Sequence, residues 1–271
     1  MRRAFLRAIL PALGLIACGK QESVPLPAPT QSAAQPASSL SAIGSSAAGP
    51  AESSPKSPSA AVVDSSCAEQ AAQDFLVRAH LNSGSMKSVQ AQLSWLSDLQ
   101  RSIRYRTEQY GYYEGYGLHA WNLRRLDSQM RSVKFFGRSV QMHERVIPAL
   151  RCVETAIEHD CADQPYRPRL LAGFRTNNTY FGGDVSNHVY GIAIDIDPND
   201  NPCCNCVKPW RDNPRCRGKK TDLERMTMPA CWITAFERFG FYWLGHDELK
   251  DTMHFEFLGD PARIIASPSP P

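Results

Sequence analysis

The sequence predicts an α+β domain that follows a long unfolded stretch. Two observations predict this class. Apolar residues recur at helical spacing up to about residue 158, whereas short apolar runs separated by turn residues follow from Phe174. Helices first and strands later are typical of a small antiparallel sheet packed against helices, here with an N-terminal helical extension. The 271 residues, 42% of them hydrophobic, can bury one sizeable core.

The charge balance excludes one class of partner. The chain has 30 Lys and Arg residues against 27 Asp and Glu residues, a formal net charge of +3. Nucleic-acid binding needs a clustered basic excess, which the sequence lacks. We therefore expect no nucleic-acid partner.

The first 17 residues predict an export signal. Three arginines precede an apolar stretch that is shorter than the ~20 residues needed to span a bilayer. The stretch ends in Leu15-Ile16-Ala17-Cys18, which resembles a bacterial lipobox, where cleavage precedes the cysteine and Cys18 is lipidated. A plain signal peptide is the alternative. By the same resemblance, Gly19 favours the outer membrane, so we expect a lipoprotein that faces the periplasm.

Residues 18–65 predict a lipidated cysteine and a disordered tether. Positions 19–65 contain 12 Ser, 10 Ala and 7 Pro and no aromatic residue, a composition that cannot bury enough apolar surface to offset its ordering entropy. As a flexible coil the tether would span roughly 40 Å. The last residues, 266–271, read as a disordered tail.

The helical part begins near Cys67 and ends in a kinked helix. Apolar spacing predicts helices over 68–80, 86–109 and 138–158, and Pro148 inside the last one predicts a kink or a break. The aromatic and glycine loop 110–117 separates them. It is either a packed turn or a platform that lines a substrate cleft. Residues 66–120 form the helical extension.

The strand part carries a polar face. Residues 191–198 alternate with period two, so that three isoleucines face one side and Ala193, Asp195 and Asp197 the other. A helix is expected over 229–239 and strands over 241–244 and 254–258. His254 and Glu256 share one strand face. An acid such as Asp195 inside an apolar strand costs several kcal/mol unless it is paired or metal-bound.

These polar strand positions are the candidates for chemistry. Hydrolysis by a zinc site needs His and carboxylate ligands, an open position for water and a nearby base. The candidates are His188, Asp195, His254 and, three residues before the last, Asp251. The sequence contains no HExxH and no GxSxG motif. Four other histidines lack a partner motif and are expected to be surface or satisfied side chains: His80, His119, His143 and His159.

The two motifs together carry a family resemblance. Ser186-x-His188-x-x-Gly191-x-Ala193-x-Asp195 resembles the SxHxxGxAxD signature of the LAS zinc peptidases, which include D-Ala-D-Ala carboxypeptidases and L-Ala-D-Glu endolysins with a Hedgehog-like fold. Asp251-x-x-His254-Phe255-Glu256 resembles that group's acid-x-x-His ending. The resemblance covers about residues 130–265 and is nearest to the endolysin-type branch. It implies a zinc peptidase domain over 121–265.

The resemblance also implies roles. His188, Asp195 and His254 would bind one Zn²⁺, and Asp251 would act as general base and then as general acid. Arg175 fits the family's upstream arginine, which polarises the scissile carbonyl or holds a substrate carboxylate.

Two further side chains have supporting roles. Ser186 would support substrate or ligand geometry. Glu256 is either a hydrogen-bond partner of a ligand histidine or part of a strand-face salt bridge. The alternative is that these residues form a structural metal site or belong to an inactive enzyme.

Nine cysteines are many for a reducing compartment. With Cys18 lipidated, eight remain, and we expect them to form disulfides whose pairing the sequence leaves open. Cys152 and Cys161 are expected to staple a helix end to the following loop, and the cluster after Asp195 has a second metal site as its alternative. The eight are Cys67, Cys152, Cys161, Cys203, Cys204, Cys206, Cys216 and Cys231.

The expected activity is zinc-dependent hydrolysis of peptidoglycan stem peptides that contain D-amino acids. An endopeptidase of the L-Ala-D-Glu type is the first choice, and a D-alanyl-D-alanine carboxypeptidase is the alternative. A non-catalytic wall-binding lipoprotein is the alternative of another class. The protein is expected to act as a monomer, anchored to the membrane through its N-terminal lipid.

Overall fold

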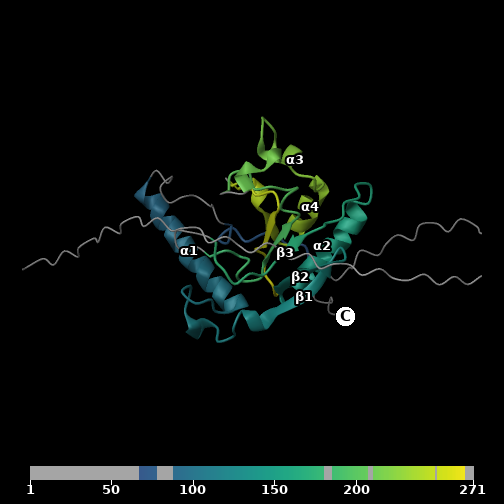
Figure 1. Cartoon of the computed structure of the whole chain (residues 1–271). Coiled ribbons are helices and arrows are strands. Elements are labelled where there is room, and N and C mark those ends of the chain that lie inside the picture. The colour runs from purple at the N-terminus through teal and green to yellow at the C-terminus, as the bar shows by residue number, and fades with distance from the viewer. Residues whose placement is uncertain (1–66, 78–87, 180–184, 207–209, 248, 266–271) are drawn as a thin grey trace, which may run out of the picture. The chain divides into compact units, whose positions relative to one another are not determined.

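The computed structural model describes residues 67–77, 88–179, 185–206, 210–247 and 249–265 (Figure 1). The predicted signal peptide, Cys18, the tether and the tail 266–271 lie outside the described residues. So does His80.

The described residues contain both helices and short strands, which confirms the α+β class. The helices are α1 (Val89–Tyr110), α2 (Ile147–Asp160), α3 (Asp222–Arg225) and α4 (Ala230–Arg238). The strands are β1 (Met130–Phe135), β2 (Arg138–His143), β3 (Leu171–Ala172), β4 (Ala193–Ile196), β5 (Phe241–Trp243) and β6 (His254–Phe257). Single 3-10 turns lie at His119–Trp121, Asp127–Gln129, Trp210–Asp212, Pro214–Cys216 and Leu244–His246.

The strands form two antiparallel sheets. β1 and β2 make a hairpin, and the larger sheet has the order β3-β4-β6-β5. β4 and β6 lie at its centre, with Asp195 opposite His254 and Ala193 opposite Glu256. This register brings side chains together that are about 60 residues apart in the chain.

The apolar face of the larger sheet packs into the core. Ile192, Ile194 and Ile196 are fully buried in the core cluster, as their period-two spacing predicts. On α4, Phe236 stacks on Phe255 of β6 with ring centroids 4.1 Å apart. α4 also packs against α2, which contacts β1. The opposite sheet face is therefore left to the polar residues.

The helix predicted over 138–158 is wrong in its first part. Residues 138–143 are strand β2, and Pro148 stands in the first turn of α2, where it starts the helix and does not kink it. Phe136 and Gly137 both have positive φ, 47° and 77°, which is the backbone of a tight hairpin turn. Val140 and Met142 are buried at strand spacing, so the period in this segment changes from two to helical near Val146.

The helix predicted over 68–80 is also wrong for residues 67–77, the part that the structure describes. The segment runs extended and turns only at residues 74–77. Its backbone N–H groups are used by distant carbonyls: Gln70 donates to Arg238 at 3.0 Å and Gln73 to Leu258 at 3.0 Å. These tertiary bonds replace the local ones of a helix.

The helix predicted over 86–109 is confirmed as α1, but its buried face is not the apolar one. Val89, Leu93 and Leu96 are 71%, 55% and 45% exposed. The buried side chains belong to the second half: Ser102, Arg106, Thr107 and Tyr110. Among the described helices, none is long and apolar enough to cross a membrane.

All eight domain cysteines are paired. The pairs are Cys67–Cys152, Cys161–Cys231, Cys203–Cys206 and Cys204–Cys216. The expected local staple by Cys152 and Cys161 is wrong, because each pairs with a cysteine 70 or more positions away. Four disulfides fit an extracytoplasmic, oxidising location.

Candidate metal centre

The centre is built on the β4–β6 pair and the turn that precedes β4. Asp195 and His254 are direct cross-strand partners, so their side chains leave the sheet on the same face. His188 reaches the same point from the turn 186–191. That turn closes when Val189 N–H donates to the Ser186 carbonyl and Gly191 N–H to the His188 carbonyl.

Gly191 makes this turn possible. Its φ is +65°, and a Cβ at this position would overlap Met130 Sδ and lie 3.0 Å from the His143 nitrogen. A side chain would therefore be strained by both the backbone and its neighbours. The glycine of the SxHxxGxAxD pattern thus sets the approach of His188 to Asp195.

Three ligand-type atoms converge within this buried site. Asp195 Oδ1 lies 2.7 Å from His254 Nδ1 and 3.2 Å from His188 Nε2, and the two ring nitrogens are 3.1 Å apart. All three lie within 4.8 Å of one another, and the residues are buried. This group can hold a metal ion.

The outer nitrogen of each ring has its own partner. His188 Nδ1 lies 2.6 Å from the Gly173 carbonyl, which can only accept, so Nδ1 carries the proton and Nε2 is left with a lone pair. His254 Nε2 lies 3.1 Å from Glu256 Oε1, which leaves His254 Nδ1 to face Asp195. Of the two expected roles of Glu256, the hydrogen-bond partner of His254 is the one present.

The charges in the site shift the pKa of each group. Burial alone raises the pKa of the Asp195 carboxyl, but His188 and His254 hold that pKa well below its usual range. Burial lowers the pKa of His188. Burial also disfavours the charged form of His254, yet the carboxylates of Asp195 and Glu256 raise its pKa to about 10. The site therefore gathers negative charge that favours a cation.

The carboxyl of Asp251 responds to the charges of His254 and Asp195, and one of its oxygens is unpaired in the described part of the chain. Its Oδ1 is buried and has no hydrogen-bond partner among the residues that the structure describes. Burial raises the pKa of this carboxyl to about 7, with His254 opposing and Asp195 adding to the increase, while the Met253 N–H donates to it. A buried carboxyl with a pKa near neutrality can take up and release a proton.

Arg175 is held near the centre by a hydrogen bond to Ser186, which is two residues before His188. Its Nη2 donates to Ser186 Oγ at 3.0 Å and to Thr179 Oγ1 at 2.9 Å, and its Nε is buried without a partner in the described part of the chain. Ser186 N–H in turn donates to Asn178 Oδ1 at 2.9 Å. The guanidinium is thus held next to His188 with a donor to spare.

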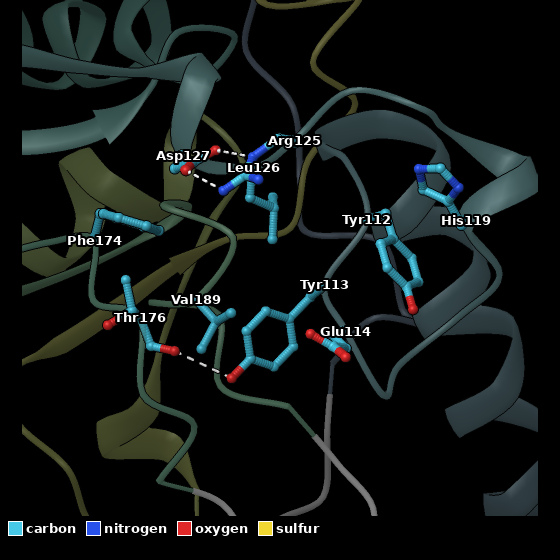
Figure 2. Close-up of a pocket in the computed structure, with 10 residues that line it drawn as sticks. All are labelled: Tyr112, Tyr113, Glu114, His119, Arg125, Leu126, Asp127, Phe174, Thr176 and Val189. Atoms are coloured by element: carbon cyan, nitrogen blue, oxygen red, sulfur yellow. Dashed lines mark hydrogen bonds and ion pairs between the residues drawn. The ribbon is translucent and has the colours of Figure 1, made fainter.

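A cavity of about 690 Å³ borders the segment 174–176 (Figure 2). Phe174 and Thr176 line it, whereas Arg175 between them turns to Ser186. Tyr113 closes the opposite wall, and its hydroxyl donates to the Thr176 carbonyl at 3.1 Å. Loop 110–117 is a packed turn against residues 174–176, as one of the two expectations had it, and it also lines this cavity.

The remaining histidines of the described chain do not join the centre. His143 is fully buried between the Tyr110 carbonyl and the Arg145 N–H, and burial lowers its pKa to about 4. His159 pairs with Asp160, and His119 packs against Tyr112. The alternative metal site in the cysteine cluster is not supported, because Cys203 and Cys206 lie near Asp251 as a disulfide and not as free thiolates.

The family comparison agrees with this geometry. Residues 180–257 match a peptidase family model described as D-alanyl-D-alanine carboxypeptidase. The match confirms the resemblance to the LAS-type peptidases. Neither the curated proteins nor the solved structures gave a match to this chain.

The LAS-type segment contains most of the centre but not all of it. His188, Asp195, Asp251 and His254 lie inside residues 180–257, whereas Arg175 lies before them. Sequence reasoning missed the Gly173 carbonyl and the Met253 N–H, because main-chain groups leave no side-chain pattern. It also missed Asn178, which accepts from the Ser186 N–H, and Arg106, which bonds to residues 185 and 187.

Proposed function

We propose that the chain is a zinc-dependent peptidase that hydrolyses peptidoglycan stem peptides containing D-amino acids, with an L-Ala-D-Glu endopeptidase as the first candidate. The observation that carries the proposal is the convergence of His188 Nε2, Asp195 Oδ1 and His254 Nδ1. The carboxyl of Asp251, whose pKa responds to the charges of His254 and Asp195, is the candidate for proton transfer. The peptidase family match supports the reaction class.

The donor set fits zinc. Two imidazole nitrogens and one carboxylate oxygen are the ligands that catalytic zinc sites use, with a fourth position left for water or substrate. The Gly173 carbonyl and Glu256 hold the outer nitrogens of the two rings, so that His188 Nε2 and His254 Nδ1 are the nitrogens that would bind the metal. Bound zinc would act as a Lewis acid and make water a stronger nucleophile near neutral pH.

Asp251 would move the proton in this reaction. Its carboxylate takes a proton from the attacking water and gives it to the amine of the leaving fragment. The pKa of about 7 applies to the protein without metal. A neighbouring dication lowers that pKa, so the carboxyl is ionised and ready to accept when the site is filled.

Arg175 would bind the substrate or the oxyanion. Its Nη2 is occupied by Ser186 and Thr179, while Nε is buried with no partner among the described residues. A fixed guanidinium stabilises negative charge on the carbonyl oxygen as the tetrahedral carbon forms, or binds a carboxylate of the stem peptide. Ser186 holds the guanidinium in place.

Two different peptide bonds of the stem peptide are candidates for cleavage. Asp251 in place of glutamate, together with His254-Phe255-Glu256, resembles the endolysin-type branch and favours cleavage between L-Ala and D-Glu. The description of the matched family model favours a D-alanyl-D-alanine carboxypeptidase. Both substrates are peptides with D-amino acids from the same polymer.

The site of action that we propose is the periplasmic face of the outer membrane. The Leu15-Ile16-Ala17-Cys18 ending supports a lipid anchor, and the 18–65 tether gives the folded part reach toward the wall. The four disulfides support export. We propose a monomer with a helical extension at 66–120 and a peptidase domain at 121–265.

Mass spectrometry of digested peptidoglycan tests the proposal, because the new peptide termini identify the bond that was hydrolysed. We expect release by the zinc-loaded wild type and none by D251A. Asp163, an exposed aspartate that belongs to neither motif, supplies the control D163A. Wild-type protein that binds peptidoglycan but releases no peptide at any zinc concentration would instead support the wall-binding lipoprotein.

A further inference from the structure

Arg106 of α1 is a fully buried cation. Its side chain is 1% exposed, although α1 exposes most of its first half. The guanidinium is anchored on its own helix, where Nε donates to the Ser102 carbonyl at 3.2 Å and Nη2 to Ser102 Oγ at 2.9 Å. Its other terminal nitrogen, Nη1, bonds to residues outside the helix.

The far side of this guanidinium holds the turn that carries His188. Nη1 donates to the Val185 carbonyl at 3.1 Å and to Asn187 Oδ1 at 2.9 Å. These acceptors flank Ser186 and directly precede His188. The guanidinium also lies over the Tyr190 ring, 5.6 Å from its centroid, so residues on both sides of His188 contact Arg106.

The turn depends on these contacts for its shape. Asn187 is fully buried, and its carbonyl accepts the Ile192 N–H at 3.1 Å, which leads the chain into β4. A shift of Asn187 therefore moves His188 relative to Asp195. The five donors of a guanidinium in one plane can bridge helix and turn at once, which a lysine ammonium cannot do with the same geometry.

We propose that Arg106 is a positioning residue for the metal centre and that α1 is part of the catalytic unit. It would hold residues 185–187 so that His188 Nε2 faces Asp195 Oδ1. α1 lies outside the matched segment 180–257, so this support comes from a part of the chain that the family match does not include. The inference rests on the proposed function, because it assumes that the centre binds zinc.

The test compares two arginines on the same helix. R106M removes the buried cation, and R104M removes an exposed one that pairs with Glu108 at 2.8 Å. Zinc affinity is measured by competition with a chelator, and thermal unfolding is recorded with and without zinc. We expect R106M to bind zinc about tenfold more weakly, because partners outside the ligand set typically affect affinity 10- to 100-fold. R104M should bind like wild type.

Two further variants separate positioning from general stability. R106K should restore only part of the zinc affinity, because lysine keeps the positive charge but lacks the planar guanidinium that donates to helix and turn together. N187A removes one acceptor from the turn, and its effect should not add to that of R106M, because both break the same bond. If R106M does not fold, N187A alone must still lower zinc affinity for the proposal to stand. The kinetics of peptide release are also measured with zinc-saturated protein. We expect kcat of R106M to fall by a larger factor than KM changes.

The outcomes distinguish the two proposals. Wild-type protein that binds no zinc overturns the proposed function and this inference with it. Wild type that binds zinc, together with folded R106M of equal zinc affinity, overturns this inference alone. A loss of thermal stability in R106M with unchanged affinity also overturns it, since that result assigns Arg106 to the fold only.

Discussion

Replacing Glu256 by glutamine tests how the centre orients its ligands. Glu256 is 1% exposed, and its Oε1 lies 3.1 Å from His254 Nε2. Glutamine has nearly the same shape, so E256Q removes the negative charge without leaving a cavity. Because the Glu256 side chain itself is buried, bulk water does not replace the lost carboxylate.

The size of the effect follows from this bond. A carboxylate that accepts from the outer nitrogen of a ligand histidine typically supports metal affinity 10- to 100-fold. We therefore expect the Kd for zinc of E256Q to rise about 10- to 100-fold, which is about 1.4–2.8 kcal/mol. The lower value applies if the glutamine Oε1 still accepts from His254.

The pH dependence has an opposing contribution. Asp195 and Glu256 together raise the pKa of His254 to about 10, so a proton competes with zinc for Nδ1 at neutral pH. E256Q lowers that pKa and weakens the competition, which offsets part of the lost affinity at low pH. The ratio of variant Kd to wild-type Kd should therefore be smaller at pH 6.5 than at pH 9.

The assay is zinc competition with a fluorescent chelator at both pH values. E237Q is the matched control, because Glu237 accepts from His246 Nε2 at 2.9 Å, is partly exposed and bonds to a histidine that is not a candidate metal ligand. It should bind zinc like wild type. Equal zinc affinity of E256Q and wild type at both pH values would refute the assignment of Glu256 as the partner that orients His254.

Four more predictions follow from single features. D251N should lose at least about 100-fold in kcat with unchanged zinc content, as expected when a general base is removed; a loss below tenfold would contradict its role. His143 has a pKa of about 4 in the folded protein against about 6.5 unfolded. The wild type should therefore lose about 3 kcal/mol of unfolding free energy as the pH falls from 6.5 to 4, and H143Q should show a flatter calorimetric profile. Removing the Cys67–Cys152 disulfide as the double serine variant should lower the unfolding free energy by about 4 kcal/mol, because it closes a loop of 85 residues; unchanged denaturant midpoints would contradict this. C18S should move from the membrane fraction to the soluble fraction, and retention would argue against a lipid anchor.

The site was more predictable than much of the fold. His188 and Asp195 are seven residues apart across one glycine turn and one strand, so local spacing defines their relation. His254 and Glu256 share a strand face by the period-two rule. That Glu256 bonds to His254, and not to a basic side chain across the sheet, depends on the β4–β6 register and was left open by the pattern.

The two wrong helices have one cause. In residues 67–73 and 138–143 the apolar spacing is compatible with both a helix and an extended strand. Contacts with residues outside each segment decide that the backbone is extended. Gln70 and Gln73 bond to the strands and helix near the C-terminus. Val140 and Met142 are buried because β2 pairs with β1. Propensity is a weak prior where tertiary contacts use the backbone groups.

The sequence by itself predicted the α+β class, the candidate metal-ligating residues and the cysteines available for pairing, because each depends on residue types at short spacing. The tertiary structure alone decided which cysteines pair, which ring nitrogen of each histidine is left for a metal, and the burial of Arg106 against residues 185–187. Arg106 and the residues it contacts are 79 and 81 positions apart, and two of the disulfides join cysteines 70 and 85 positions apart. Their cause is the antiparallel register and the packing of α1, since distances across a folded chain are set by contacts that short-range patterns do not encode.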